Sequence, residues 1–258
     1  MEDSIARIIN KKNKWIFCHS DITSFLVSNP DKMKLKLKDK DIDIFSIFFA
    51  ILGFLKILVI FIKQFPSKKL KTSTLPDHIV ASLVKHHHAN YFKFFNKDRK
   101  KTYMVFNCFD RNDFTKIYTL SFKKIFKEFL NNSKELNKVL TMTMPKELRK
   151  IVISNTAKNL AVYSYFSALF CELKTIKPQL TLFQSGAELI SHAAKINNIT
   201  NYCLAHGLTG KASPINIPDY DFMYVYSREE KNYLNSLGIK TNINIYPIKE
   251  NDKKLRKI

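Results

Sequence analysis

The residues best suited to chemistry lie in the segment NYCLAHGLTGKASP, residues 201–214, where a short apolar run ends at His206 and Gly207. The pKa of histidine lies near neutral pH, so His206 could act as a general base on an acceptor hydroxyl or donate a hydrogen bond to a phosphate. Gly207 and Gly210 would let the backbone approach a ligand and offer N–H groups to an anion, and Lys211 would add a positive charge. The alternative is structural: His206 hydrogen-bonds a neighbouring carbonyl and the glycines form turns.

His206 follows the second strand of a predicted β-α-β unit. The unit consists of a buried strand, a turn with a helix, and a second strand, whose sequences are QLTLFQ, SGAELISHAAKINN and ITNYCLA. A crossover of this kind predicts parallel strands covered by helices. Ligands of open parallel sheets bind beyond the carboxyl ends of the strands. We therefore expect Gln184, Ser185 and Gly186, which end the first strand, to share one crevice with His206.

The segment after the His-Gly loop predicts more of the same sheet. DFMYVYS at 221–227 is typical of a third strand, and Ser227 caps a following helix in a capping box with Glu230. Gly238 ends that helix, and residues 239–248 are a fourth strand candidate. This order of elements predicts an α/β fold with a Rossmann-like, doubly wound parallel sheet.

The layout around His206 also resembles a known family. AHGLTGK is followed by PDYDFMYVYSREEKNYLNSLGI and NIYPIKEND, and it is preceded by KPQLTLFQSGAELISHAAKINNIT. Over residues 176–252 this pattern resembles bacterial GT-B type glycosyltransferases, which build capsule, lipopolysaccharide or teichoic acid. The resemblance implies two facing Rossmann-like domains, the first mainly holding the acceptor and the second the nucleotide-activated donor sugar. It implies that His206 is catalytic and that Lys211 and Ser227 bind substrate.

The sequence departs from the family pattern in one respect. After YPIKEND such proteins enter a donor domain, whereas this sequence continues only with KKLRKI. Three explanations stay open: the chain is a truncated or divergent relative, a separate partner supplies the donor domain, or the domain binds without catalysing.

No metal or cofactor is expected in the site. The four cysteines are far apart and never form a CxxC pair: Cys18, Cys108, Cys171 and Cys203. Three histidines follow one another at positions 86–88, but consecutive helical residues point about 100° apart and cannot all face one metal. A solvated helix end is the favoured interpretation of this run.

The charge of the chain favours an anionic partner. The formal net charge is +21, with thirty Lys and Arg against fourteen Asp and Glu in residues 1–150 and thirteen against eight afterwards. An anionic membrane surface, a phosphorylated substrate or nucleic acid would fit, and so would a lysine-rich composition without functional meaning. Binding to nucleic acid is not expected, because zinc-finger spacing, an RNP-like motif and an arginine-rich reading helix are all missing from the sequence.

Residues 44–62, IFSIFFAILGFLKILVIFI, form an apolar run with the single charge Lys56, and they are flanked by lysine-rich segments. Three interpretations are open: a transmembrane helix, a buried core helix, and a helix lying in the membrane interface with its lysines at anionic headgroups. The flanking lysines favour membrane contact. We expect a cytoplasmic protein, peripheral on the inner face of the cell membrane, with a single span as the alternative.

Three further elements are predicted between this apolar run and the β-α-β unit. Residues 101–109 are a short buried strand, Asp113 begins a helix that runs to Asn132, and Pro145 starts a long helix that ends before Pro178. The domains are a basic N-terminal region at 1–75, an α/β domain at 76–248 and a basic tail at 249–258.

The function predicted from these features is that of a membrane-associated glycosyltransferase acting on a nucleotide sugar and a glycan acceptor. The alternatives are a non-catalytic α/β binding or assembly protein at the membrane and, favoured only by charge, a nucleic-acid-binding protein.

Overall fold

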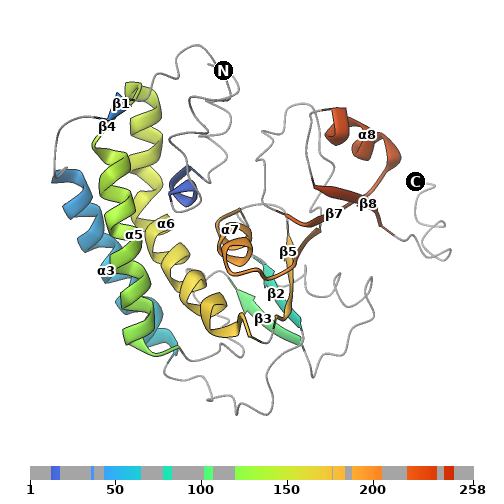
Figure 1. Cartoon of the computed structure of the whole chain (residues 1–258), viewed down its shortest axis with the longest axis horizontal. Helices are drawn as coiled ribbons and strands as arrows, with labels where there is room; N and C mark the ends of the chain where they lie inside the picture. Colours follow the sequence, from blue (N-terminus) through green and yellow to red (C-terminus); the bar gives the residue numbers. More distant parts are fainter. Residues whose placement is uncertain are drawn as a thin grey trace, which may run out of the picture.

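The protein combines a layer of long helices with a parallel β-sheet (Figure 1). The computed structural model describes residues 13–17, 36–37, 44–64, 78–82, 102–106, 120–175, 177–183, 188–204, 220–236 and 241–246. In chain order the elements are η1 Lys14–Phe17, β1 Lys36–Leu37, α3 Ile44–Gln64, β2 His78–Ser82, β3 Thr102–Phe106, α5 Phe122–Leu140, β4 Met142–Thr143, α6 Lys146–Leu173, β5 Gln179–Phe183, α7 Glu188–Ile196, β6 Asn201–Leu204, β7 Phe222–Val225, α8 Arg228–Ser236 and β8 Asn242–Ile245.

The main sheet has six strands in the order β3-β2-β5-β6-β7-β8, and every neighbouring pair is parallel. The chain runs from β2 outward to β3 and then returns to place β5 on the other side of β2, so the topological switch point lies between β2 and β5. Leu180 and Leu182 of β5 and Cys203 of β6 are fully buried. The predicted α/β class with a parallel sheet is therefore confirmed. A separate pair, β1 with β4, is antiparallel.

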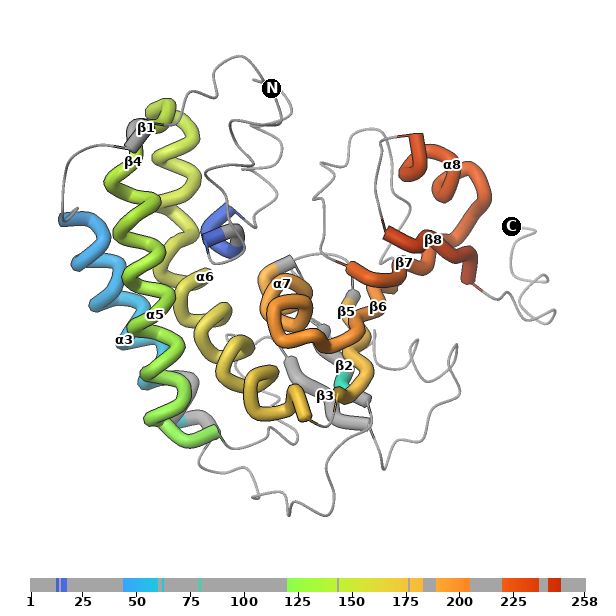
Figure 2. Tube along the Cα trace, viewed as in Figure 1, coloured from blue at the N-terminus to red at the C-terminus, as the bar shows by residue number. Residues whose placement is uncertain are grey.

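Three long helices, α3, α5 and α6, pack against one another to form the helical layer, and α7 lies between α6 and the sheet (Figures 1 and 2). Phe54 of α3 packs against the rings of Phe122, Phe126 and Phe129 on α5 at centroid distances of 5.7–6.3 Å. On the opposite side of α6, Tyr163 stacks between Trp15 of η1 and His192 of α7. Aromatic packing thus joins the helical layer to η1 and to α7, the helix beside the sheet.

The apolar segment predicted at 44–62 is the helix α3, which buries one stripe of side chains and exposes the other. Ser46, Phe49, Gly53 and Ile57 are buried, whereas large apolar side chains at the intervening positions are exposed. Of the three interpretations, that of a buried core helix therefore holds for one face of α3 and not for the other. Over the residues whose side chains are described, no helix combines the length and the apolar character that crossing a membrane requires.

The prediction of one continuous helix from Asp113 to Asn132 is wrong. Leu120 and Ser121 are not helical, and α5 begins only at Phe122 because Ser121 takes an extended backbone as its N-cap (φ −69°, ψ 139°). The carbonyl of Ser121 accepts the first hydrogen bonds of the new helix from Lys124 and Ile125. The helix then runs to Leu140, well beyond the predicted end.

Strand β2 was not predicted at all, although it lies beside β5 in the middle of the sheet. Its sequence, HIVAS, is too short to show a period by itself. The histidines at 86–88 lie outside the described residues, as does the basic tail at 249–258. The predicted division into domains stays a prediction, and α3, assigned to the N-terminal region, packs on helices assigned to the α/β domain.

Most other elements match their predictions. β3 lies within the predicted strand 101–109, and α6 starts directly after Pro145 and ends at Leu173, before Pro178. Helix α7 ends in a Schellman motif, in which Ile199 N donates to Ala194 O and Asn198 N to Lys195 O. Asn198 takes the left-handed conformation that the motif requires (φ 55°). This turn leads the chain directly into β6.

Candidate functional site

The crevice is predicted at the carboxyl edge of strands β5, β6 and β7, and these three strands are consecutive neighbours in the sheet. Phe183, the last residue of β5, is the register partner of Leu204, the last residue of β6. Leu204 is in turn the register partner of Tyr224 on β7. The carboxyl ends of β5 and β6 therefore lie side by side, as the β-α-β prediction required. The following predicted site residues on them lie outside the described residues: Gln184, Ser185, Gly186, His206, Gly207, Gly210 and Lys211.

Ser227 is the predicted site residue that the structure describes, and its hydroxyl caps helix α8. Glu230 N donates to Ser227 Oγ at 3.1 Å, and the Glu230 carboxylate accepts from Tyr226 N at 3.0 Å. The first bond satisfies an N–H group that the start of a helix leaves free, which confirms the predicted cap by Ser227. The second differs from a capping box, because Glu230 accepts from Tyr226, the residue before the cap, and not from Ser227. The pKa of the exposed Glu229 is lowered, first by its own backbone N–H and then by the Ser227 hydroxyl. Ser227 thus holds α8 at the same edge of the sheet.

Two stacked tyrosines lie beside Ser227 at the ends of β7 and β8. The rings of Tyr226 and Tyr246 are 4.9 Å apart at 25°. Burial raises the pKa of Tyr246 far above its ordinary value, and burial followed by the charge of Glu230 raises that of Tyr226. Both phenols therefore stay protonated at neutral pH, so they could donate hydrogen bonds there but could not act as bases.

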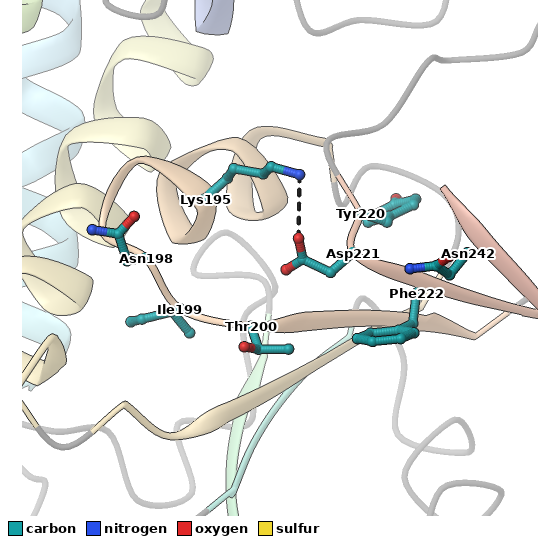
Figure 3. A pocket seen from close by; sticks show the side chains of 8 residues that line it. All are labelled: Lys195, Asn198, Ile199, Thr200, Tyr220, Asp221, Phe222 and Asn242. Atoms are coloured by element: carbon teal, nitrogen blue, oxygen red, sulfur yellow. Dashed lines mark hydrogen bonds and ion pairs between the residues drawn. The ribbon is translucent and has the colours of Figure 1, made fainter. Parts of the chain in front are cut away.

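A pocket of about 530 Å³ lies at the opposite, amino edge of the sheet (Figure 3). Its lining comes from the turn after α7 and from the beginnings of β6, β7 and β8: Lys195, Asn198, Ile199, Thr200, Tyr220, Asp221, Phe222 and Asn242. Sequence reasoning pointed to the carboxyl edge and missed this pocket. The available signal was the polar segment PDYD directly before β7, together with the paired asparagines after α7.

Asp221 is the centre of the polar wall of this pocket. Lys195 Nζ lies 3.2 Å from Asp221 Oδ1 (Figure 3). Asn201 donates its backbone N–H and its side-chain amide to Asp221 Oδ2 at 3.0 and 3.3 Å. Asn201 is fully buried and accepts a bond from Ser191 Oγ of α7 at 3.4 Å. The carboxylate thus ties α7 to the starts of β6 and β7. Its oxygens are already occupied, which favours a structural role over acid–base chemistry.

The amino edge also carries a sequence pattern that is typical of metal sites. PDYD contains two aspartates in an Asp-x-Asp pattern, but Asp219 lies outside the described residues and Asp221 is engaged as above. Within the described ranges, no three His, Cys, Asp or Glu side chains come together in a group that could hold a metal ion. The pocket therefore offers a half-exposed ammonium, Lys195, and a set of amides and aromatic rings.

Comparisons with known proteins add no assignment to this geometry. Neither a protein family, nor a curated protein, nor a solved structure matches the chain.

Proposed function

We propose that the protein is a membrane-associated glycosyltransferase of the GT-B type, which transfers a sugar from a nucleotide-activated donor to a cell-surface glycan such as capsule or lipopolysaccharide. The observation that carries the proposal is the adjacency of β5, β6 and β7. These parallel strands end at one edge, directly before the segments that hold Gln184 and His206 and at the cap formed by Ser227. The strand order, with its switch point between β2 and β5, is that of a doubly wound parallel sheet, and sheets of this kind bind ligands at the carboxyl ends of their strands.

The proposed reaction uses His206 as the general base. His206 takes the proton of the acceptor hydroxyl while the hydroxyl oxygen forms a bond to the anomeric carbon of the donor sugar. The bond from that carbon to the nucleotide diphosphate breaks, and the diphosphate leaves with the electron pair. Lys211 and the backbone N–H groups of Gly207 and Gly210 stabilise the negative charge on this leaving group.

The test compares two variants of the full chain with the wild type. His206→Ala removes the proposed base, and Lys195→Ala removes the cation of the pocket at the amino edge. Transfer and hydrolysis of radiolabelled nucleotide sugars are measured, and circular dichroism checks folding. We expect His206→Ala to lose about a hundredfold or more in rate, which is typical for a general base. Lys195→Ala should retain wild-type activity.

Other outcomes count against the proposal in distinct ways. Loss of activity in Lys195→Ala with retention in His206→Ala would move the site to the amino edge. A folded wild type that neither transfers nor hydrolyses nor binds any nucleotide sugar would favour the alternative of a non-catalytic binding or assembly protein.

A further inference from the structure

The outer face of α3 carries an uninterrupted row of exposed apolar side chains. Its members are each 46–77% exposed and recur at helical spacing along the whole helix: Ile44, Phe45, Ile47, Phe48, Ile51, Leu55, Val59 and Ile62. Among the described residues, only three other large apolar side chains are exposed, and they lie singly on other elements: Leu130, Ile196 and Ile245. A contiguous apolar face of this kind marks an interaction surface, whereas scattered single residues do not.

The inner face of α3 is occupied by the protein itself. Gly53 lies so close to α6 that a Cβ added to it would come within 2.9 Å of the Leu160 side chain. Ser46 Oγ donates to Asn137 Oδ1 of α5 at 2.6 Å, and Ile57 is fully buried. Because α5 and α6 cover this side of the helix, a partner can meet α3 only along its outer row.

Positive charge borders the apolar row on the α5 side. Phe122 and Phe126 form the edge of α5 that contacts Phe54 of α3. With about 100° between successive residues, the exposed Lys123 and Lys134 lie roughly a quarter to a third of a turn from that edge, toward solvent. Lys127 follows next on the same exposed arc, whereas the acidic residues Glu128 and Glu135 fall on the far side of α5.

The α6 side of the row is also basic. The guanidinium of Arg149 lies 5.9 Å from the ring centroid of the exposed Phe45, and Lys56 is half-buried on α3 between the apolar row and α6. The helices α3, α5 and α6 together carry eleven Lys and Arg against four Glu. By contrast, α7 and α8 each carry as many acidic as basic residues. The excess of positive charge therefore lies on the helical layer, which is also the part that carries the exposed apolar face.

A second copy of the chain is a poor fit to this surface. In a symmetric dimer the same face meets itself, so the basic borders of two copies would be placed against each other. Like charges opposed across an interface are unfavourable. An anionic lipid surface, in contrast, offers an apolar interior to the row and negative headgroups to its borders.

We propose that α3 lies in the interface of an anionic bilayer, with its outer row at the level of the acyl chains and with the lysines of α5 and Arg149 at the lipid phosphates. Such helices sit parallel to the surface and gain affinity from both apolar burial and anionic headgroups. This inference identifies the surface behind the membrane association in the proposed function, but it does not depend on sugar transfer. A protein inactive toward nucleotide sugars can still bind lipid in this way.

The test is co-sedimentation of the full chain with vesicles, because the helical layer has not been shown to fold alone. Vesicles of equal parts phosphatidylglycerol and phosphatidylcholine are compared with vesicles of phosphatidylcholine alone. We expect binding to the anionic vesicles that weakens as salt rises. The triple variant Phe48→Asn, Ile51→Asn, Leu55→Asn should lose about tenfold or more in partitioning, since it removes exposed apolar area without touching the buried stripe.

Two matched variants separate the parts of the surface. Ile245→Asn replaces an exposed isoleucine on β8, away from the helical layer, and should bind vesicles like the wild type. The triple variant Lys123→Gln, Lys127→Gln, Lys134→Gln should lose the preference for anionic vesicles while keeping the fold. Thermal melts of every variant without vesicles check folding.

Three results would overturn the proposal. The first is vesicle binding by the folded α3 triple variant at the wild-type level. The second is an equal loss of binding in Ile245→Asn. The third is a wild type that ignores vesicles and instead forms a dimer that the α3 triple variant dissociates, which would make the face an interface between copies.

Discussion

Helices α3 and α6 contact each other and share the neighbour α5, yet they bury their apolar residues differently. α3 carries two charged residues in 21 positions, and α6 carries six in 28. The more apolar helix is nevertheless the more exposed one: every residue of α6 from Asn159 to Phe170 is buried, whereas α3 has its exposed outer row. The reason is position, because α6 lies between α3 and α5 on one side and η1 and α7 on the other.

The composition of a helix sets how much apolar surface it has, while its neighbours decide how much of that surface is covered. If this is correct, the same substitution should have opposite consequences in the two helices. In α6 it should act on stability, and on the outer face of α3 it should act on binding.

The largest expected difference comes from the same change in both helices, Leu160→Ala and Leu55→Ala. Leu160 is fully buried in α6, so its truncation should cost about 2–5 kcal/mol of the free energy of unfolding. Leu55 is 51% exposed, and its truncation should cost less than about 1 kcal/mol. Urea denaturation followed by circular dichroism measures both. Equal losses in the two variants would show that the outer face of α3 is covered by protein, and the comparison would fail.

A second test asks how tightly the two helices meet at Gly53. A Cβ at this position would lie 2.9 Å from Leu160 Cδ2 and 3.3 Å from Phe129 Cε2, so Gly53→Ala overpacks the contact. Overpacking outweighs the gain from removing a helical glycine, and a net loss of about 1 kcal/mol is expected. In the Leu160→Ala background the contact with Leu160 is removed and only the one with Phe129 at 3.3 Å remains, so Gly53→Ala should stabilise by up to about 1 kcal/mol. A double-mutant cycle in urea measures this change of sign, and additive effects would contradict the close contact.

The polar links of the two helices to α5 provide a third, smaller contrast. α6 is linked by Asn132 Nδ2, which donates to Ser164 Oγ at 3.1 Å in a buried site, and α3 by the partly buried pair Ser46 and Asn137. Ser164→Ala should cost about 1–3 kcal/mol because a buried amide loses a partner. Ser46→Ala should cost less, because water can reach Asn137. Thermal melts of both variants show which one loses more stability. A larger loss in Ser46→Ala would mean that the contact shielded from water lies between α3 and α5.

Elements with local signals could be predicted from the sequence. Prediction failed where contacts with residues far away in the sequence determine the structure. Pro145 and the Ser227–Glu230 pair marked the starts of α6 and α8, and alternation of apolar runs with a helix between them indicated β5, α7 and β6. The break at Ser121 was missed because aromatic spacing continued through it. The apolar run at 44–62 indicated a helix but not which face would be covered, since α5 and α6 supply that cover from up to a hundred residues away.

The candidate site shows the same division. The adjacency of the ends of β5 and β6 followed from the β-α-β pattern, since a crossover fixes parallel neighbours. The amino-edge pocket depends on Lys195 and Asn201 reaching Asp221 across 26 and 20 residues. Such contacts leave no periodic signal in a single sequence, and the local signals at this edge were the polar segment PDYD and the paired asparagines with the turn residue Asn198.

The smallest expected effect concerns Glu128 on α5, the helix that α3 and α6 share. Burial raises the pKa of its carboxyl, and the nearby Lys127 offsets only part of this. A carboxyl with a raised folded-state pKa is disfavoured in its ionised form, so it weakens the fold at pH values above both its folded and its unfolded pKa. The penalty disappears as the pH falls below the ordinary glutamate pKa of about 4.3.

Glu128→Gln should therefore raise the melting temperature slightly at pH 7 and leave it unchanged near pH 4, with the difference growing as the pH rises between these values. Lys127→Gln is the matched control, because it removes the compensating charge and should lower the melting temperature at pH 7. A carboxyl on the open side of α5 would behave in the opposite way: surrounded by the lysines that face the outer row of α3, it would stabilise when ionised. If Glu128→Gln instead destabilises the protein at pH 7, Glu128 lies on the solvent-exposed side of α5. The helical layer would then not have the covered and open sides described above.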